Sequence, residues 1–182
     1  MSTQQTWYTA EDLMRLSSLG KRYELVKGEL IESPLREGRR GRVASRINHR
    51  LGDFVEEHDA GEVFAAETGF SLASSPDTVR APDAAFVSRE RLPSEDQLIG
   101  FPPLAPDLVV EVVSPSDSAG QVQAKIEEWL RAGVRLVWVA YPDTRSVVVY
   151  RTRDEVAVLG PEDTLEGDPV LPGFTRAVSD IF

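Results

Sequence analysis

The stretch Pro106-Asp107-Leu108-Val109-Val110-Glu111-Val112-Val113-Ser114-Pro115 decides the fold. A run of apolar and β-branched residues between two prolines is typical of a strand that is buried on both faces. Upstream, Arg80-Ala81-Pro82-Asp83-Ala84-Ala85-Phe86-Val87 has the same character, and downstream a helical pattern carries Lys125. The sequence therefore predicts two buried strands, one with Asp83 and one with Glu111, followed by a helix.

Glu111 stands in the middle of a valine-rich run. Because side chains alternate along a strand, Glu111 shares its face with Val109 and Val113. A buried carboxylate is costly unless a cation, hydrogen-bond donors or a water-lined cleft compensate it. Glutamate within such a run is also disfavoured by strand propensity and by burial. These arguments favour a functional role for Glu111.

Asp83 poses the same problem at the start of its strand, where it shares a face with Ala85 and Val87. If the two strands are neighbours, the two acids can converge on one divalent metal ion, since hard cations prefer oxygen ligands. The alternative is that Asp83 serves a turn or caps the strand, as aspartate after proline often does.

The helix after Ser114-Pro115 supplies a basic residue that can reach the acids. Lys125 lies at the edge of an apolar stripe, one turn before Trp129, and from there its ammonium group can extend back over the sheet. The alternative is that Lys125 extends its charged end into water. The stripe consists of Ala119, Val122, Ile126, Trp129 and Leu130.

Pro82-Asp83, the Glu111 strand and Lys125 together resemble the core of a PD-(D/E)XK nuclease, in the form found in the Uma-two family. Further blocks in the order and spacing of that family cover nearly the whole chain. They are Tyr8–Leu13, Tyr23–Val26 with Gly28–Leu30, Glu67–Phe70, Val79–Val87, Ala105–Asp117, Ala132–Pro142 and Leu171–Phe174.

Two positions depart from the family's pattern. The superfamily lysine two residues after the strand glutamate is Val113 here, so by resemblance Lys125 fills that role. Many members also carry His-Gly at the start of the first long helix, where this chain has Arg40-Gly41. The role of that histidine, as a general base or as a contact to phosphate, therefore does not transfer directly to this chain.

The resemblance implies an α+β fold with an α/β core: a restriction-endonuclease-like mixed β-sheet flanked by helices, with an N-terminal helix and β-hairpin, in a single domain over residues 1–182. It implies a metal-dependent endonuclease that hydrolyses phosphodiester bonds, with DNA favoured over RNA. Asp83 and Glu111 would hold Mg²⁺ or Mn²⁺, and Lys125 would orient a water or stabilise charge on the phosphate. Because such proteins often pair to cut two strands, a homodimer is also expected.

The resemblance adds Glu24, in the expected hairpin, to the acidic cluster. It would act there as a further metal ligand or as the group that orients Lys125. The alternative is an exposed acid at a strand edge. Alternation in an expected strand over residues 61–72 also turns Glu67 toward the acids.

The amino-acid composition limits the kinds of catalytic and metal-binding site that the chain can form. The 182 residues suffice for one domain with a core, and 41% hydrophobic and 27% charged residues are typical of a globular protein. The absence of cysteine excludes disulfides, thiolate zinc sites and a cysteine nucleophile. With His49 and His58 as the two histidines, both expected at the surface, a metal must be bound by carboxylates. An N-terminus without a basic region and the lack of a long apolar run predict a cytoplasmic protein without a membrane partner.

The net charge of −10 argues against extensive non-specific binding to a polyanion. One basic concentration stands out, formed by Arg36, Arg39, Arg40, Arg42, Arg46 and Arg50. Guanidinium groups match phosphate geometry, so Arg39, Arg42, Arg46 and Arg50 are candidate nucleic-acid contacts. The alternative is a solvated helix face whose arginines pair with nearby acids.

Periodicity and turn residues place the other elements. Parallel pairing of the strand over residues 134–141 with the Glu111 strand follows from the intervening helix. The expected elements are a helix from Thr9 to about Gly20, a hairpin over 23–26 and 29–32, a helix over 40–58, a polar excursion over 88–103 with a short helix near 95–99, strands over 147–151 and 155–159, and a final helical turn over 178–182.

Two other functions compete with the nuclease. The fold can serve as a binding module for nucleic acid or for a protein partner without catalysing a reaction, and the basic helix then binds the ligand. Alternatively, Asp83 and Glu111 can act as a general acid/base pair, as in glycosidases. The glycosidase-like reading ranks lowest because it leaves Lys125 without a role.

Overall fold

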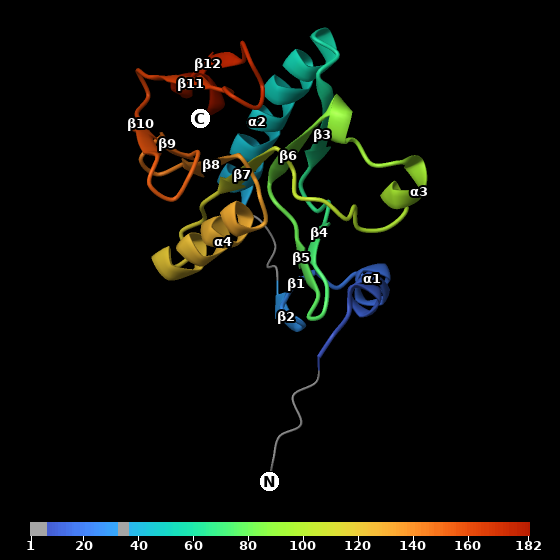
Figure 1. The fold of residues 1–182 in the computed structure, drawn as a ribbon. Coiled ribbons are helices and arrows are strands. Elements are labelled where there is room, and N and C mark those ends of the chain that lie inside the picture. Colours follow the sequence, from blue (N-terminus) through green and yellow to red (C-terminus); the bar gives the residue numbers. More distant parts are fainter. Residues whose placement is uncertain (1–6, 33–36) are drawn as a thin grey trace. The chain divides into compact units, whose positions relative to one another are not determined.

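The computed structural model describes residues 7–32 and 37–182 (Figure 1). Contacts divide the chain into two compact units. The first unit consists of Met1–Leu35, Thr68–Ala81 and Pro93–Ala105, and the second consists of Arg36–Glu67, Pro82–Leu92 and Pro106–Phe182. The single domain expected from the sequence stays a prediction. Arg36, one of the expected basic residues, lies outside the described residues.

The first unit contains a four-stranded antiparallel sheet in the order β2-β1-β5-β4. Thr9 caps helix α1: its hydroxyl accepts from the Asp12 N–H while the Asp12 carboxylate accepts from the Thr9 N–H. The predicted N-terminal helix and hairpin are confirmed. The elements are α1 (Ala10–Ser18), β1 (Tyr23–Val26), β2 (Glu29–Glu32), β4 (Phe70–Ala73), β5 (Thr78–Arg80) and α3 (Glu95–Leu98).

The second unit contains a six-stranded mixed sheet in the order β10-β9-β8-β7-β6-β3. Strands β7 and β8 run parallel, as predicted, and the other neighbouring strands run antiparallel. This mixed sheet with helices confirms the predicted fold class. The elements are α2 (Gly38–Glu57), β3 (Gly61–Ala65), β6 (Ala84–Ser88), η1 (Arg89–Arg91), β7 (Leu108–Val112), α4 (Ala119–Arg131), β8 (Leu136–Tyr141), β9 (Ser146–Tyr150), β10 (Val156–Leu159), β11 (Thr164–Glu166), β12 (Thr175–Ala177) and η2 (Val178–Ile181).

Strand β7 is buried on both faces, as its apolar run predicts. Leu108, Val110 and Val112 belong to the same core cluster as the apolar side of α2. Because side chains alternate, Val109 and Glu111 lie on the opposite face, and Glu111 contacts α4 there. The sheet of the second unit is therefore covered by α2 on one face and by α4 on the other.

The expected strand over residues 61–72 is wrong. β3 ends at Ala65, β4 begins at Phe70, and the two strands belong to different sheets. Glu67 lies exposed in the turn between them with φ of 78°. The expectation that Glu67 points into the sheet with the other acids is therefore wrong, because strand alternation does not extend through a left-handed residue.

The expected strand through Asp83 is shorter than predicted. β5 ends at Arg80 and β6 begins at Ala84, in separate sheets, so Asp83 immediately precedes its strand. Pro82 lacks the N–H that would continue a ladder, which accounts for the break. The β11–β12 hairpin was not predicted, because strands of three residues are too short to show periodicity.

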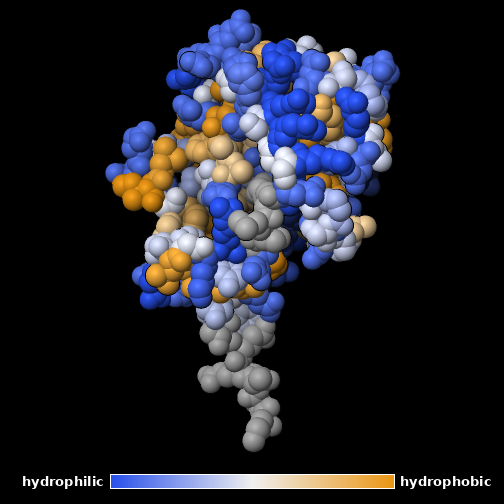
Figure 2. Space-filling model, turned by 180° about the vertical axis from the view of Figure 1, so that it is seen from behind, coloured by the Kyte–Doolittle hydropathy of each residue, from blue (hydrophilic) through white to orange (hydrophobic). Residues whose placement is uncertain are grey.

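Hydrophilic residues cover most of the face that Figure 2 shows, and apolar residues form separate small patches. Among the described residues, the exposed large apolar side chains include Trp7, Leu19, Ile99 and Val158. None of the helices in residues 7–32 and 37–182 is long and apolar enough to cross a bilayer.

Candidate active site

Asp83 is held against β7 by two backbone hydrogen bonds. Its N–H donates to the Val110 carbonyl at 2.9 Å, and its Oδ2 accepts from the Val112 N–H at 2.7 Å. These two groups belong to the residues on either side of Glu111. The strand that follows Asp83 and the strand that contains Glu111 are therefore neighbours, which is the condition for the two acids to converge, and Asp83, 1% exposed, lies beside Glu111.

Glu111 is held by two side chains of α4. Its Oε2 accepts from Lys125 Nζ at 3.0 Å, and its Oε1 accepts from Trp129 Nε1 at 2.9 Å. Lys125 and Trp129 are four residues apart, so they lie on one face of the helix. The lysine extends back over the sheet as expected, with 19% of its side chain exposed. A buried carboxylate and its ammonium partner thus lie together.

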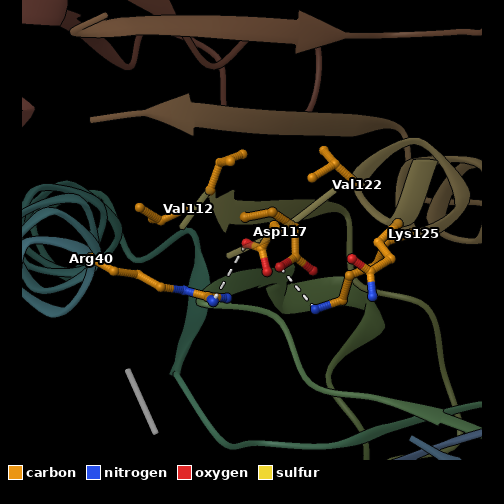
Figure 3. Close-up of a pocket in the computed structure, with 8 residues that line it drawn as sticks. Arg40, Val112, Asp117, Val122 and Lys125 are labelled. Atoms are coloured by element: carbon orange, nitrogen blue, oxygen red, sulfur yellow. Dashed lines mark hydrogen bonds and ion pairs between the residues drawn. The ribbon is translucent and has the colours of Figure 1, made fainter. Parts of the chain in front are cut away.

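Arg40 adds a second cation, from the first turn of α2. Its Nη2 lies 3.2 Å from Asp83 Oδ2, and its Nη1 lies 3.7 Å from Asp117 Oδ2. Asp117 belongs to the loop after β7, where its Oδ2 also accepts from the Ser114 N–H at 2.8 Å. Figure 3 shows Arg40 and Lys125 approaching from opposite sides, with Asp117 between them.

Four of these charged residues, Arg40, Glu111, Asp117 and Lys125, line a pocket of about 80 Å³ in the second unit, and Asp83 contacts it through Arg40 (Figure 3). This space can hold about five water molecules. Arg40 and Lys125 contribute two positive charges, against three negative charges from Asp83, Glu111 and Asp117, so the group carries a net charge of −1 when all are ionised. The balance favours an additional cation. The lining residues are Arg40, Glu111, Val112, Val113, Asp117, Gln121, Val122 and Lys125.

Glu24 lies in the first unit, on β1 between β2 and β5. Its Oε2 accepts from Arg80 Nη1 at 2.6 Å, and the residue is 8% exposed. The alternative of an exposed acid at a strand edge is therefore wrong. Its membership of the acidic cluster stays a prediction.

The arginines of α2 differ in their surroundings. Arg39 pairs with Asp143 at 2.6 Å, and Arg46 donates to the Phe182 carbonyl. Arg42 is exposed and Arg50 is half-buried, and within the described part of the chain neither makes an ion pair. Arg39 fits the solvated-face alternative, whereas Arg42 and Arg50 have guanidinium groups available to a ligand.

Three residues that contact the acids or line the pocket were not assigned to the site from the sequence. Trp129 was interpreted as a core aromatic, although its spacing of four from Lys125 could have indicated a second contact to Glu111. Arg40 was grouped with the basic surface. Asp117 gave no sequence signal, since an aspartate in a Ser-Pro loop is commonly a turn residue.

A model of the Uma2 family, described as "Putative restriction endonuclease", matches residues 10–179. The chain belongs to the Uma2 family. A crystal structure described as "a putative nuclease belonging to DUF820 from Anabaena variabilis ATCC 29413" has a similar fold, with a TM-score of 0.80 and 23% identity over 96% of this chain and 97% of that chain. No curated protein is a significant match to the chain.

Proposed function

We propose that this Uma2 family member is a metal-dependent endonuclease that hydrolyses phosphodiester bonds of nucleic acid, with DNA as the favoured substrate. The observation that carries the proposal is that Asp83, at the start of β6, lies beside Glu111 of the neighbouring strand β7, and that Glu111 binds Lys125 of α4. Family membership supports the same class of reaction. A cytoplasmic location and a homodimer that cuts two strands belong to this proposal.

The donor atoms fit a divalent cation, because hard ions such as Mg²⁺ and Mn²⁺ prefer carboxylate oxygens. Asp83 and Glu111 would hold the ion. An ionised carboxylate has about four lone-pair sites, so the hydrogen bonds from Lys125 and Trp129 leave Glu111 acceptor capacity. Within the described residues no group of three or more His, Cys, Asp or Glu side chains is arranged as a metal site. Waters or substrate oxygens would therefore complete the coordination.

When bound, such an ion acidifies a water and withdraws charge from the phosphate. Lys125 would then orient the attacking water or donate to the oxygen on which negative charge develops. Trp129 keeps one oxygen of Glu111 fixed, and the Val112 N–H does the same for Asp83. These contacts limit the reorientation that the two carboxylates need during the reaction.

The nucleic acid would approach along α2, where Arg39, Arg42, Arg46 and Arg50 supply guanidinium groups. Arg42, Arg46 and Arg50 follow one another at four-residue steps, which places them along one side of the helix. Arg42 and Arg50 would contribute most to the binding affinity for nucleic acid, because Arg39 must first break its ion pair with Asp143.

The test is cleavage of DNA and RNA by purified protein with Mn²⁺ or Mg²⁺, and with EDTA in place of the metal. Glu111→Gln and Lys125→Met should each lower the rate about 100-fold or more, because each removes a charged group from the reacting centre. Glu166→Gln, at an exposed strand glutamate, and Lys21→Met, at an exposed lysine, are matched controls that should retain activity.

Cleavage that persists in EDTA, or in the Glu111→Gln protein, would contradict the proposal. If the wild-type protein binds DNA in a salt-dependent manner but cuts no substrate with either metal, the binding module without turnover is the better assignment. Sugar hydrolysis insensitive to chelator would favour the acid/base pair instead.

A further inference from the structure

Arg40 lies apart from the basic surface to which its sequence position assigns it. Arg39 and Arg42, its neighbours on α2, are exposed, whereas 14% of the Arg40 side chain is exposed. Its guanidinium group lies in the pocket (Figure 3), 3.2 Å from Asp83 and 3.7 Å from Asp117. Arg40 is therefore part of the carboxylate site.

The contacts of Arg40 are loose for a buried arginine. Charge-assisted hydrogen bonds usually measure about 2.7–2.9 Å, whereas the two distances to the carboxylates are 3.2 and 3.7 Å. Its Nε is also buried without a hydrogen-bond partner among the described residues. An arginine whose role is to fix structure would use more of its five N–H groups. Charge, rather than a matched fork geometry, holds it in place.

We propose that Arg40 is the counter-cation of the metal-free site and competes with a divalent ion for Asp83. This inference rests on the proposed function, since it takes Asp83 as a metal ligand. A guanidinium group and a divalent ion that bind the same carboxylate repel each other, because both carry positive charge. The repulsion is strong in a partly buried site, where water screens charges little. Asp117 supplies a second anchor, which retains the guanidinium in the pocket when it leaves Asp83.

A different role would give Arg40 the opposite effect on metal binding. If Arg40 supported Asp83 in the orientation that a metal needs, its removal would weaken metal binding. If it competes, its removal strengthens metal binding and destabilises the metal-free protein, because the buried Asp83 carboxylate loses a positively charged neighbour. The sign of the change in metal affinity separates the two roles.

The experiment measures Mn²⁺ binding by isothermal titration calorimetry and thermal unfolding in EDTA and in Mn²⁺. Arg40→Gln should bind Mn²⁺ about tenfold or more tightly than wild type, since an opposite charge near a carboxylate shifts its pKa by about 1 to 3 units. Its Tm should fall in EDTA and should rise more on addition of Mn²⁺ than that of wild type. Arg131→Gln, which removes an exposed charge from α4, should leave Mn²⁺ affinity unchanged.

Unchanged or weaker Mn²⁺ binding by Arg40→Gln overturns the inference, as does equal tightening by Arg131→Gln. Asp83→Asn tests the underlying metal site separately. If Asp83→Asn abolishes the Mn²⁺ binding of the wild type while Arg40→Gln leaves affinity unchanged, the inference about Arg40 fails and the proposed function stands. If neither wild type nor Arg40→Gln binds Mn²⁺, both fail. Should Arg40→Gln not fold, Arg40→Met, which also removes the charge but keeps an unbranched side chain, should show the same gain in Mn²⁺ affinity, and no gain overturns the inference.

Discussion

Three carboxylates of the second unit are almost fully buried: Asp83, Asp107 and Glu111. Asp107 accepts from the Ser88 N–H at 2.8 Å, from Arg91 at 2.5 Å and from Arg135. These partners do not line the pocket, whereas the residues that bind Asp83 do. Asp107 therefore has a structural role at the start of β7. Since Pro82-Asp83 and Pro106-Asp107 are the same dipeptide, the sequence pattern alone cannot separate the two roles.

The first prediction at the residue scale concerns Asp107 and acid stability. Burial raises the pKa of Asp107, but hydrogen bonds from Ser88, Arg135 and Arg91 outweigh it and leave the pKa below the usual value of 3.8. A lowered folded-state pKa stabilises the protein above the unfolded pKa, and this contribution is lost as the pH falls below about 4. Asp107→Asn should therefore lower the free energy of unfolding by about 2–3 kcal/mol at pH 7.

Urea denaturation at pH 7 and at several values below 4 measures this effect, and the difference between wild type and Asp107→Asn should shrink as the pH falls. Asp143→Asn is the matched control, because Asp143 also pairs with an arginine but is exposed, and it should change stability by less than about 1 kcal/mol. A difference between wild type and Asp107→Asn that stays constant with pH would contradict the argument.

The residues of the site were predictable to different degrees. Glu111 could be identified because a charged residue within an apolar run is rarely explained by a structural role alone. Lys125 could be identified because helical spacing placed it at the edge of the buried apolar stripe. Trp129 gave a weaker signal, its spacing of four from Lys125, and Arg40 gave none, since its place in the sequence does not reveal which acid a guanidinium group contacts. Their roles depend on the packing of α2 and α4 against opposite faces of the sheet.

At the scale of elements, the apolar runs and the helix caps were predictable from the sequence. The start of α1 at Thr9 and the parallel pairing of β7 with β8 followed from local signals. The breaks at Glu67 and at Ala81–Asp83 did not, because a chain that leaves one sheet for another can keep an apolar composition. Period-2 alternation describes a strand and carries no information about which sheet it joins.

Gly61 provides the prediction at this scale. It begins β3 opposite Ser88 of β6, with φ of 150°, and an added Cβ would lie 2.1 Å from the Val87 carbonyl oxygen. The backbone atoms of a paired strand cannot yield without breaking the ladder. Gly61→Ala should therefore lower the free energy of unfolding by about 2 kcal/mol or more.

Gly52→Ala is a matched comparison, for which we expect the free energy of unfolding to change in the opposite direction. It lies in α2, and an added Cβ would have no atom within 4 Å. Gly52→Ala should stabilise the protein by about 0.5–1 kcal/mol, because alanine loses less backbone entropy in a helix. Thermal and chemical denaturation of both variants measure the pair. A Gly61→Ala protein as stable as wild type would show that the β3–β6 edge adapts to a side chain.

At the scale of the whole molecule, a net charge of −10 must be reconciled with a nucleic-acid substrate. The polyanion and the protein repel each other over most of the surface, so productive contact has to be local. The proposed local surface is α2, where Arg42 and Arg50 make no ion pair among the described residues. Binding is then expected to be weak at physiological salt and to rise steeply as the salt concentration falls.

The last prediction concerns the slope of that salt dependence. Each phosphate contact releases counterions, so the logarithm of the binding constant falls with the logarithm of salt concentration by about 0.9 per contact on duplex DNA. In the Glu111→Gln background, which is expected not to cut the probe, replacing Arg42 and Arg50 by Gln should reduce the slope by about 1 for each arginine. Fluorescence anisotropy with labelled duplex DNA at several salt concentrations measures it.

Arg15→Gln is the control, because Arg15 is also an exposed helix arginine but belongs to α1. It changes the net charge by the same amount and should leave the slope unchanged. If Arg15→Gln lowered affinity and slope as much as Arg42→Gln, the attraction would follow from total charge and not from the α2 surface. The four-residue spacing of the α2 arginines would then reflect a solvated helix face, and the route of the nucleic acid to Asp83 and Glu111 would have to lie elsewhere.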